Sequence, residues 1–208
     1  LARAVKAGSI APVYLLYGDN QRMMDEALKR ITAAVLPEQS SGLDLHQYTA
    51  QTHAPGDILQ ALRTVPFMSS KKLVIVRDAH LFKPPQLKQV LAACERPSAR
   101  CCLVVVLHGD LRVKKERERI KSLSAYGEVI VCENPRGERN VGLCITQELA
   151  RQGKKIAPDA LSLLSAVLDE NAQAIAHEAE KLALYCGERE TVTRADVGEV
   201  VSCGVRDT

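Results

Sequence analysis

The chain has 208 residues, a length that suits one large and one small domain. Of these residues, 46% are hydrophobic and 25% charged, which is typical of a soluble globular protein. Its apolar runs are far shorter than the ~20 residues that cross a bilayer, and no signal-peptide pattern opens it, so we expect a cytoplasmic protein. The net charge of +3 is too small to indicate nucleic-acid binding by itself.

The first two thirds of the chain alternate short apolar runs with stretches of helical period. An apolar run at residues 13–17 ends at Gly18, and apolar residues then recur at helical spacing up to position 35. Further strands are expected at residues 43–49, 73–76, 101–107 and 129–132, and further helices near residues 58–62, 87–91 and 113–125. The strands are continuously apolar, as a sheet covered by helices on both faces requires. This pattern predicts a doubly wound parallel α/β domain.

Beyond residue 133 the strand signals disappear and only helical periods remain. Helices are expected around residues 141–149, 160–168, 175–182 and 197–201. The last of these has Thr193 as a candidate N-cap and Asp196 at the capping-box position. We therefore place a boundary near residues 134–140, with an α/β domain at 1–138 and a small helical domain at 139–208.

The segment Val65-Pro66-Phe67-Met68 joins a predicted helix to a predicted strand. The chain has only two Phe and no Trp, so a Phe placed in a Ser- and Lys-rich loop is unusual. One interpretation is an ordinary packed loop, and the other is a knob that binds a partner. Val65, Pro66, Phe67 and Met68 are therefore the candidate binding residues.

A helical domain after an α/β domain is the layout of AAA+ ATPases, in which the turn after the first strand binds phosphate. Here that turn is Gly18-Asp19-Asn20 and lacks the Gly-Lys-Thr/Ser sequence that wraps phosphates and binds Mg²⁺. A later strand ends in Asp78 without the adjacent Glu that would orient a water, so we interpret Asp78 as a strand-end residue that caps the next turn. The sequence predicts a degenerate nucleotide site and no ATP hydrolysis.

Other catalytic and metal-binding patterns are missing from the sequence. The seven Cys form no CxxC pair, the five His form no HxxxH or HExxH pattern, and no GxSxG is present. Cys101, Cys102 and Cys132 lie in apolar runs, where a reduced thiol behaves as a small buried hydrophobe. His177 is expected on a solvated helix face. We therefore expect reduced thiols, no metal and no cofactor.

In their order and spacing, five segments resemble the delta subunit family of bacterial DNA polymerase III, the clamp-loader subunit that opens the sliding clamp. The segments are residues 13–19, 57–69, 73–79, 150–161 and 178–185, and the resemblance covers roughly residues 12–202. It implies an α/β fold with an AAA+-like doubly wound parallel sheet domain, a lost nucleotide site and a small helical lid domain. It also implies a non-catalytic subunit of the polymerase holoenzyme, which is a DNA-directed DNA polymerase.

The same resemblance implies partners and a binding site. In the family a hydrophobic pair in the loop before a sheet strand enters a pocket on the sliding clamp, or beta subunit. Pro66 and Phe67 occupy these positions, although the pair is often Leu-Phe. The family also joins other loader subunits through a C-terminal helical collar and meets DNA in the complex. Because the collar is missing here, we expect a truncated delta subunit.

Two alternatives from other classes remain open. One is an active AAA+ ATPase with an atypical phosphate loop, which a nucleotide-binding titration would distinguish. The other is a DNA-binding module that uses the basic residues of one predicted helix, which are Lys114, Lys115, Arg117, Arg119 and Lys121. For that helix, a solvated surface with many charge pairs is the competing interpretation.

Overall fold

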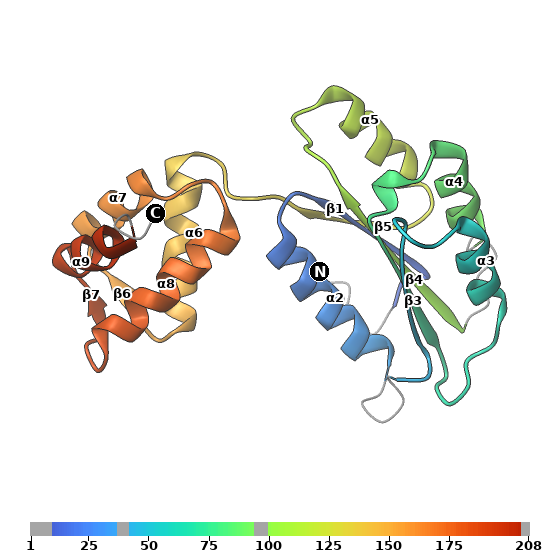
Figure 1. Ribbon diagram of the computed structural model, residues 1–208, viewed down its shortest axis with the longest axis horizontal. Helices are drawn as coiled ribbons and strands as arrows, with labels where there is room; N and C mark the ends of the chain where they lie inside the picture. The colour runs from blue at the N-terminus through green and yellow to red at the C-terminus, as the bar shows by residue number, and fades with distance from the viewer. Residues whose placement is uncertain (1–9, 37–41, 94–99, 205–208) are drawn as a thin grey trace. The chain divides into compact units, whose positions relative to one another are not determined.

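The computed structural model of the chain describes residues 10–36, 42–93 and 100–204. The chain forms two compact units that divide between Glu133 and Asn134. The first unit alternates strands with helices, and the second is mainly helical (Figure 1). Within the described ranges, no helix is long and apolar enough to cross a membrane.

A five-stranded parallel sheet, with strand order β2-β3-β4-β1-β5, forms the centre of the α/β unit. Its strands are β1 Val13–Gly18, β2 Leu45–Thr49, β3 Lys72–Arg77, β4 Cys101–His108 and β5 Glu128–Cys132. Its helices are α2 Gln21–Val35, α3 Pro55–Arg63, α4 Pro84–Ala92 and α5 Lys114–Leu123. Helix α2 covers one face of the sheet, and α3, α4 and α5 cover the other (Figure 1). The prediction of a doubly wound parallel α/β unit is confirmed.

Two hydrophobic cores lie on opposite faces of this sheet. Successive side chains of a strand point to opposite faces, so Leu15 packs in the core under α3, α4 and α5, and Leu16 packs in the core under α2. Both side chains are fully buried. Successive positions of a central strand are therefore buried on one face or the other, which explains the continuous apolar runs of the sequence.

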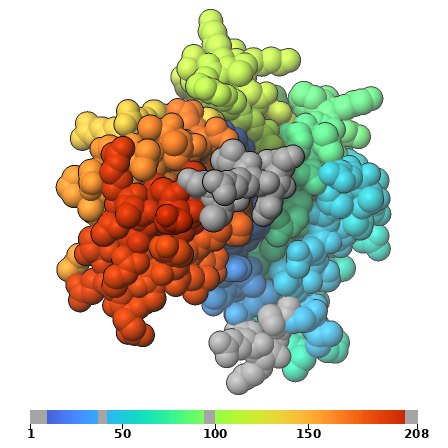
Figure 2. Space-filling view, turned by 60° about the vertical axis from the view of Figure 1, so that its left-hand side comes forward, coloured from blue at the N-terminus to red at the C-terminus, as the bar shows by residue number. Residues whose placement is uncertain are grey.

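The second unit packs its helices around a third core. The helices are α6 Gly137–Arg151, α7 Pro158–Val167, α8 Ala172–Cys186 and α9 Arg194–Gly204. Apolar residues at helical spacing, such as Val141, Ile145 and Leu149 on α6, are buried in this core. In the space-filling view, the side chains of α7 to α9, in orange to red, pack closely against one another (Figure 2).

The N-terminal cap of α9 follows the sequence prediction. The Thr193 N–H donates to Asp196 Oδ2 at 2.8 Å, and the Asp196 N–H donates to Thr193 Oγ1 at 3.4 Å. These reciprocal bonds form the expected capping box, which satisfies two backbone donors at the start of the helix.

The helical unit also contains two short strands that the sequence analysis did not predict. Strand β6, Lys155–Ile156, pairs in parallel with β7, Thr191–Val192. The expectation of no strand beyond residue 133 was therefore wrong. Two residues are too few to produce a detectable alternation of apolar and polar side chains, so only the tertiary pairing defines these strands.

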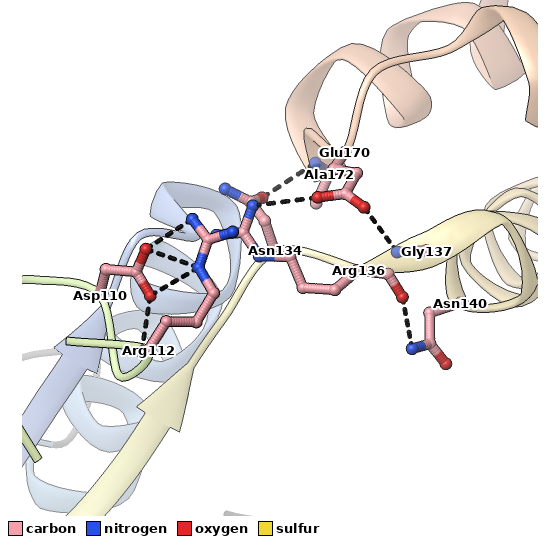
Figure 3. Close-up of polar contacts among 8 residues, drawn as sticks. All are labelled: Asp110, Arg112, Asn134, Arg136, Gly137, Asn140, Glu170 and Ala172. Carbon is pink, nitrogen blue, oxygen red and sulfur yellow. Dashed lines mark hydrogen bonds and ion pairs between the residues drawn. The ribbon is translucent and has the colours of Figure 1, made fainter. Parts of the chain in front are cut away.

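The first residues of the helical unit are bonded to the start of α8 and to the loop that precedes it (Figure 3). The Asn134 side-chain oxygen accepts a hydrogen bond from the Ala172 N–H at 3.0 Å. The Glu170 carboxylate accepts from the Gly137 N–H at 2.6 Å and pairs with Arg136 at 3.4 Å. These bonds explain why the helical unit starts at Asn134, a few residues before the sequence-based boundary at 138/139.

Candidate functional site: the loop before β3 and the turn after β1

The loop between α3 and β3 presents apolar side chains to solvent. Phe67 is 80% exposed, Val65 is 74% exposed and Met68 is 65% exposed, while Pro66 is half-buried. Phe82, the only other Phe, is 7% exposed and lies in a core. The structure thus brings the four candidate binding residues together in one loop and shows that Phe67 is not packed inside it.

A buried carboxylate binds the backbone of this loop. Asp44 is 1% exposed, and its two carboxylate oxygens accept hydrogen bonds from three successive backbone N–H groups, those of Phe67 at 2.6 Å, Met68 at 3.0 Å and Ser69 at 2.6 Å. These bonds keep the pKa of the Asp44 carboxyl well below its usual range, and the bond from the Phe67 N–H contributes most. The carboxylate therefore remains charged and bonded to the loop at neutral pH.

A buried ammonium group holds the start of the same loop. Lys72 is the first residue of β3 and is fully buried. Its Nζ donates to the carbonyl oxygens of Ala61 and Thr64, and to Thr64 Oγ1 at 2.8 Å. These acceptors lie at the C-terminal end of α3, where the helix dipole favours a cation. A buried charge is tolerated when it is hydrogen-bonded in this way, and here the bonds connect the end of α3 to the start of β3.

Asp44 and Lys72 are site residues that the sequence analysis missed. Asp44 lies 23 residues before Phe67 in sequence, in a stretch that gave only a weak strand signal. Lys72 follows Lys71 at the edge of an apolar run, a position where a solvated Lys is common. The placement of a Lys directly before the Leu73 strand was the only local signal, and it does not distinguish a buried from an exposed ammonium group.

The turn after β1 is closed onto the end of β5. The N–H groups of Asp19 and Asn20 both donate to the Cys132 carbonyl at 3.0 Å. Gly18 has a φ of +150°, and a Cβ at this position would lie 1.8 Å from the Cys132 oxygen. In a phosphate-binding loop such backbone N–H groups point to the ligand, whereas here they are used inside the protein.

Asn20 completes the closure of this turn. It is 3% exposed, and its Oδ1 accepts from the Met23 N–H at 3.0 Å as the N-cap of α2. Its Nδ2 donates to the Glu133 carbonyl at 3.1 Å. The turn residues Gly18, Asp19 and Asn20 therefore form a structural junction between β1, α2 and the end of β5.

Asp78, directly after β3, caps the turn that follows, as expected from the sequence. The residue adopts a left-handed conformation with φ +54°, and its side chain makes no cap bond to the following turn. Its carboxylate instead accepts from Thr49 Oγ1 at 3.0 Å and Gln51 Nε2 at 3.2 Å, and lies 3.6 Å from His108 Nε2. Its side chain takes no part in the cap, because the carboxylate accepts from donors at the neighbouring strand ends. Only its carbonyl closes the turn, by accepting from the Leu81 N–H at 2.9 Å.

Further polar side chains near the carboxyl ends of the strands contact one another. Tyr17 donates its hydroxyl hydrogen to Glu116 Oε2 at 2.8 Å, and burial followed by this bond raises the pKa of Tyr17. The rings of His80 and His108 meet edge to face at 5.3 Å, and burial together with His108 lowers the pKa of His80. Among the described residues, no three His, Cys, Asp or Glu side chains are arranged to hold a metal ion.

The cysteines that the structure describes are spread over both units. Cys101, Cys132 and Cys186 form no disulfide, and burial raises the pKa of Cys132 to about 11. Cys94 lies outside the described residues, as does the side chain of Cys203.

The basic residues of α5 lie on a charged surface that also contains acids. Lys114 pairs with Glu118 at 3.9 Å, and Arg119 pairs with Glu116 at 3.7 Å. Arg117 donates to the Leu111 carbonyl, while Lys115 and Lys121 are exposed. His177 is exposed on α8. The arrangement of α5 favours a solvated helix with charge pairs over a continuous basic surface.

The strand order of the sheet and the small helical unit after it define the class to which the chain belongs, an AAA+-like fold. The family described as DNA polymerase III, delta subunit, matches residues 14–133. The chain belongs to this family, and the resemblance stated from the sequence is confirmed.

A curated protein and a solved structure, both from Bacillus subtilis, match almost the whole chain. The DNA polymerase III subunit delta of strain 168 is 22% identical over 207 residues, which cover 96% of this chain and 59% of that protein. The solved structure of the Bacillus subtilis DNA clamp loader delta protein is 20% identical, with a TM-score of 0.66, and the match covers 96% of this chain and 61% of that one. The chain thus spans about three fifths of the length of these relatives.

The Thermotoga maritima RuvB Holliday junction branch migration motor has a similar fold. Its TM-score is 0.60 at 10% identity, and the match covers 98% of this chain and 65% of that chain. At this level of identity the likeness concerns the fold alone.

Proposed function

We propose that the chain acts as the part of a clamp-loader delta subunit that binds and opens the sliding clamp, and that Phe67 is its main contact. The observation that carries the proposal is the 80% exposure of Phe67 in a loop whose backbone is bonded to Asp44. Family membership supplies the partner. The other loader subunits, and DNA met through the complex, belong to the same proposal.

The chemistry of the loop suits insertion into an apolar pocket. An exposed aromatic ring loses contact with water when it enters such a pocket, and buried aromatic anchors carry most of the binding energy of many interfaces. Val65 and Met68 extend the apolar surface on either side of Phe67, and Met adapts easily to an irregular pocket. Pro66 fixes its own φ and limits the conformations of the loop before binding.

Opening of the clamp follows from differential affinity. A protein that binds the open clamp more tightly than the closed clamp shifts the equilibrium toward the open state by that difference alone. The chain needs no chemical step of its own for this. We propose that control by ATP comes from neighbouring subunits.

The closed turn after β1 supports the proposal that the chain does not bind nucleotide. The N–H groups of Asp19 and Asn20 already donate to Cys132, and the turn contains no Lys to balance phosphate charge. Nucleotide binding would require these bonds to break and would place Asp19 beside a polyanion.

Two titrations test the proposed function. In the first, the chain is titrated with the sliding clamp of the same organism by calorimetry, and we expect saturable binding. In the second, the melting temperature is measured with and without Mg·ATP, and we expect no shift, since any ligand that binds only the native state raises it. A clamp that does not bind refutes the proposed partner, whereas an ATP-dependent shift refutes the lost nucleotide site and favours an active AAA+ ATPase.

A further inference from the structure

The loop that carries Phe67 has little packing of its own to keep it in place. The side chains of Val65, Phe67 and Met68 are all at least 65% exposed, so hydrophobic contacts contribute little to its conformation. Loops of this kind sample many backbone conformations unless hydrogen bonds restrict them. What fixes this loop must therefore be polar.

The polar restraint on Phe67 and its neighbours is the Asp44 carboxylate. Three consecutive N–H groups, from Phe67 to Ser69, converge on Asp44, whose oxygens lie 2.6 to 3.0 Å from the three nitrogens. Bonds of this kind to a charged acceptor are about twice as strong as neutral ones. Asp44 is itself attached to the sheet, since its carbonyl accepts from the Leu73 N–H at 2.8 Å.

This arrangement sets which side of the loop faces outward. The backbone N–H groups of Phe67 and Met68 point inward to Asp44, while their side chains are 80% and 65% exposed. At the other end of the loop, Lys72 bonds the carbonyl and hydroxyl groups of Thr64. The loop is thus held at Thr64, just before the apolar residues, and at the backbone of Phe67, Met68 and Ser69, while the side chains of Phe67 and Met68 project outward.

We infer that Asp44 is a positioning residue for clamp binding, which touches no partner but keeps the loop in the conformation that presents Phe67. This inference rests on the proposed function. Its physical basis is preorganisation. When only a fraction of molecules has the binding-competent loop, the measured dissociation constant rises by the reciprocal of that fraction.

The test compares two variants that each change one buried, hydrogen-bonded Asp. Asp44→Asn keeps the shape of the side chain but replaces one acceptor oxygen with an NH₂ group that cannot accept from the loop. Asp196→Asn is the control, because Asp196 is 5% exposed, accepts from the Thr193 N–H and lies in the helical unit. We expect Asp44→Asn to weaken clamp binding about tenfold, as for a loop that is competent in about one molecule in ten. We expect Asp196→Asn to leave clamp affinity unchanged.

A double-mutant cycle separates an effect through Phe67 from a general loss of folding. If Asp44 acts by presenting Phe67, Asp44→Asn should weaken binding much less in a Phe67→Ala background than in the unmutated chain. Equal effects in both backgrounds would overturn the inference, as would an equal loss of clamp affinity in Asp196→Asn.

Amide hydrogen exchange measures how well the loop is ordered when no clamp is present. In the unmutated chain, the amides of Phe67, Met68 and Ser69 should exchange slowly although their neighbourhood is exposed, and Asp44→Asn should accelerate these three amides about tenfold or more. Rates typical of an unstructured chain in the unmutated protein would overturn the positioning role, even if Asp44→Asn failed to fold. Slow exchange combined with no clamp binding would instead overturn the proposed function.

Discussion

The two phenylalanines of the chain allow one matched experiment, because truncating each to Ala removes the same ring from opposite environments. Phe67 is 80% exposed, whereas Phe82 is 7% exposed and lies in the core that also contains Leu87 and Leu91. Phe67→Ala should lower the free energy of unfolding by no more than about 0.5 kcal/mol, as at ordinary surface sites. Phe82→Ala should lower it by about 3–5 kcal/mol, because it leaves a cavity in a packed core.

The effect on clamp affinity should be the reverse. An aromatic side chain presents about 200 Å² of surface, so complete burial of a ring that is 80% exposed contributes up to about 4 kcal/mol at about 25 cal/mol/Å². Desolvation of nearby polar groups and ordering of the complex reduce this gain. We therefore expect Phe67→Ala to cost about 2 kcal/mol of binding free energy, or roughly a thirtyfold weaker dissociation constant. Phe82→Ala should bind the clamp normally at temperatures where it is folded.

Urea denaturation and calorimetric titration with the clamp, on both variants, provide the measurements. Two results would refute the reasoning. A loss of stability in Phe67→Ala as large as that in Phe82→Ala would show that Phe67 is packed in the fold. Unchanged clamp affinity in a folded Phe67→Ala would show that the exposed ring is not the contact.

Two further predictions concern stability. The hydrogen bond from Arg189 keeps the pKa of the Asp196 carboxyl well below its usual range. The charged carboxylate therefore stabilises the fold at pH values above about 4, the pKa of an Asp in the unfolded chain, and this stabilisation is lost as the pH falls below that value. Asp196→Asn should therefore reduce the loss of unfolding free energy at acid pH. Urea denaturation at about one-unit intervals from pH 5 to pH 2 would measure this loss, and an unchanged dependence on pH would contradict the prediction. Gly18→Ala should destabilise the chain by roughly 1–3 kcal/mol, because the new Cβ meets the Cys132 oxygen. Gly56→Ala is the control, because Gly56 lies in α3 with open space around it, and this change should be neutral or stabilising. Equal stability of the two variants would show that the turn after β1 is not closed onto β5.

The candidate site shows where inference from sequence ends. The residues around Phe67 left a packed loop and an exposed knob both open, and the resemblance to the delta subunit family favoured the exposed position. The missing Gly-Lys-Thr/Ser after β1 was visible in the sequence. The two residues that hold the loop were not, since Asp44 and Lys72 look like ordinary surface charges until the fold buries them.

The sequence by itself determined the type and order of the longer elements, because periods of 2 and 3.6 residues depend only on neighbours along the chain. It thereby predicted the parallel α/β unit, the helices after it and the capping box of Asp196. Only the tertiary structure decided which strands are neighbours, that Asp44 accepts from a loop 23 residues away, and that residues 155–156 pair with residues 191–192. These contacts join segments far apart in the chain, and whether a charged group or a two-residue strand finds a partner depends on where the packed sheet and helices place it.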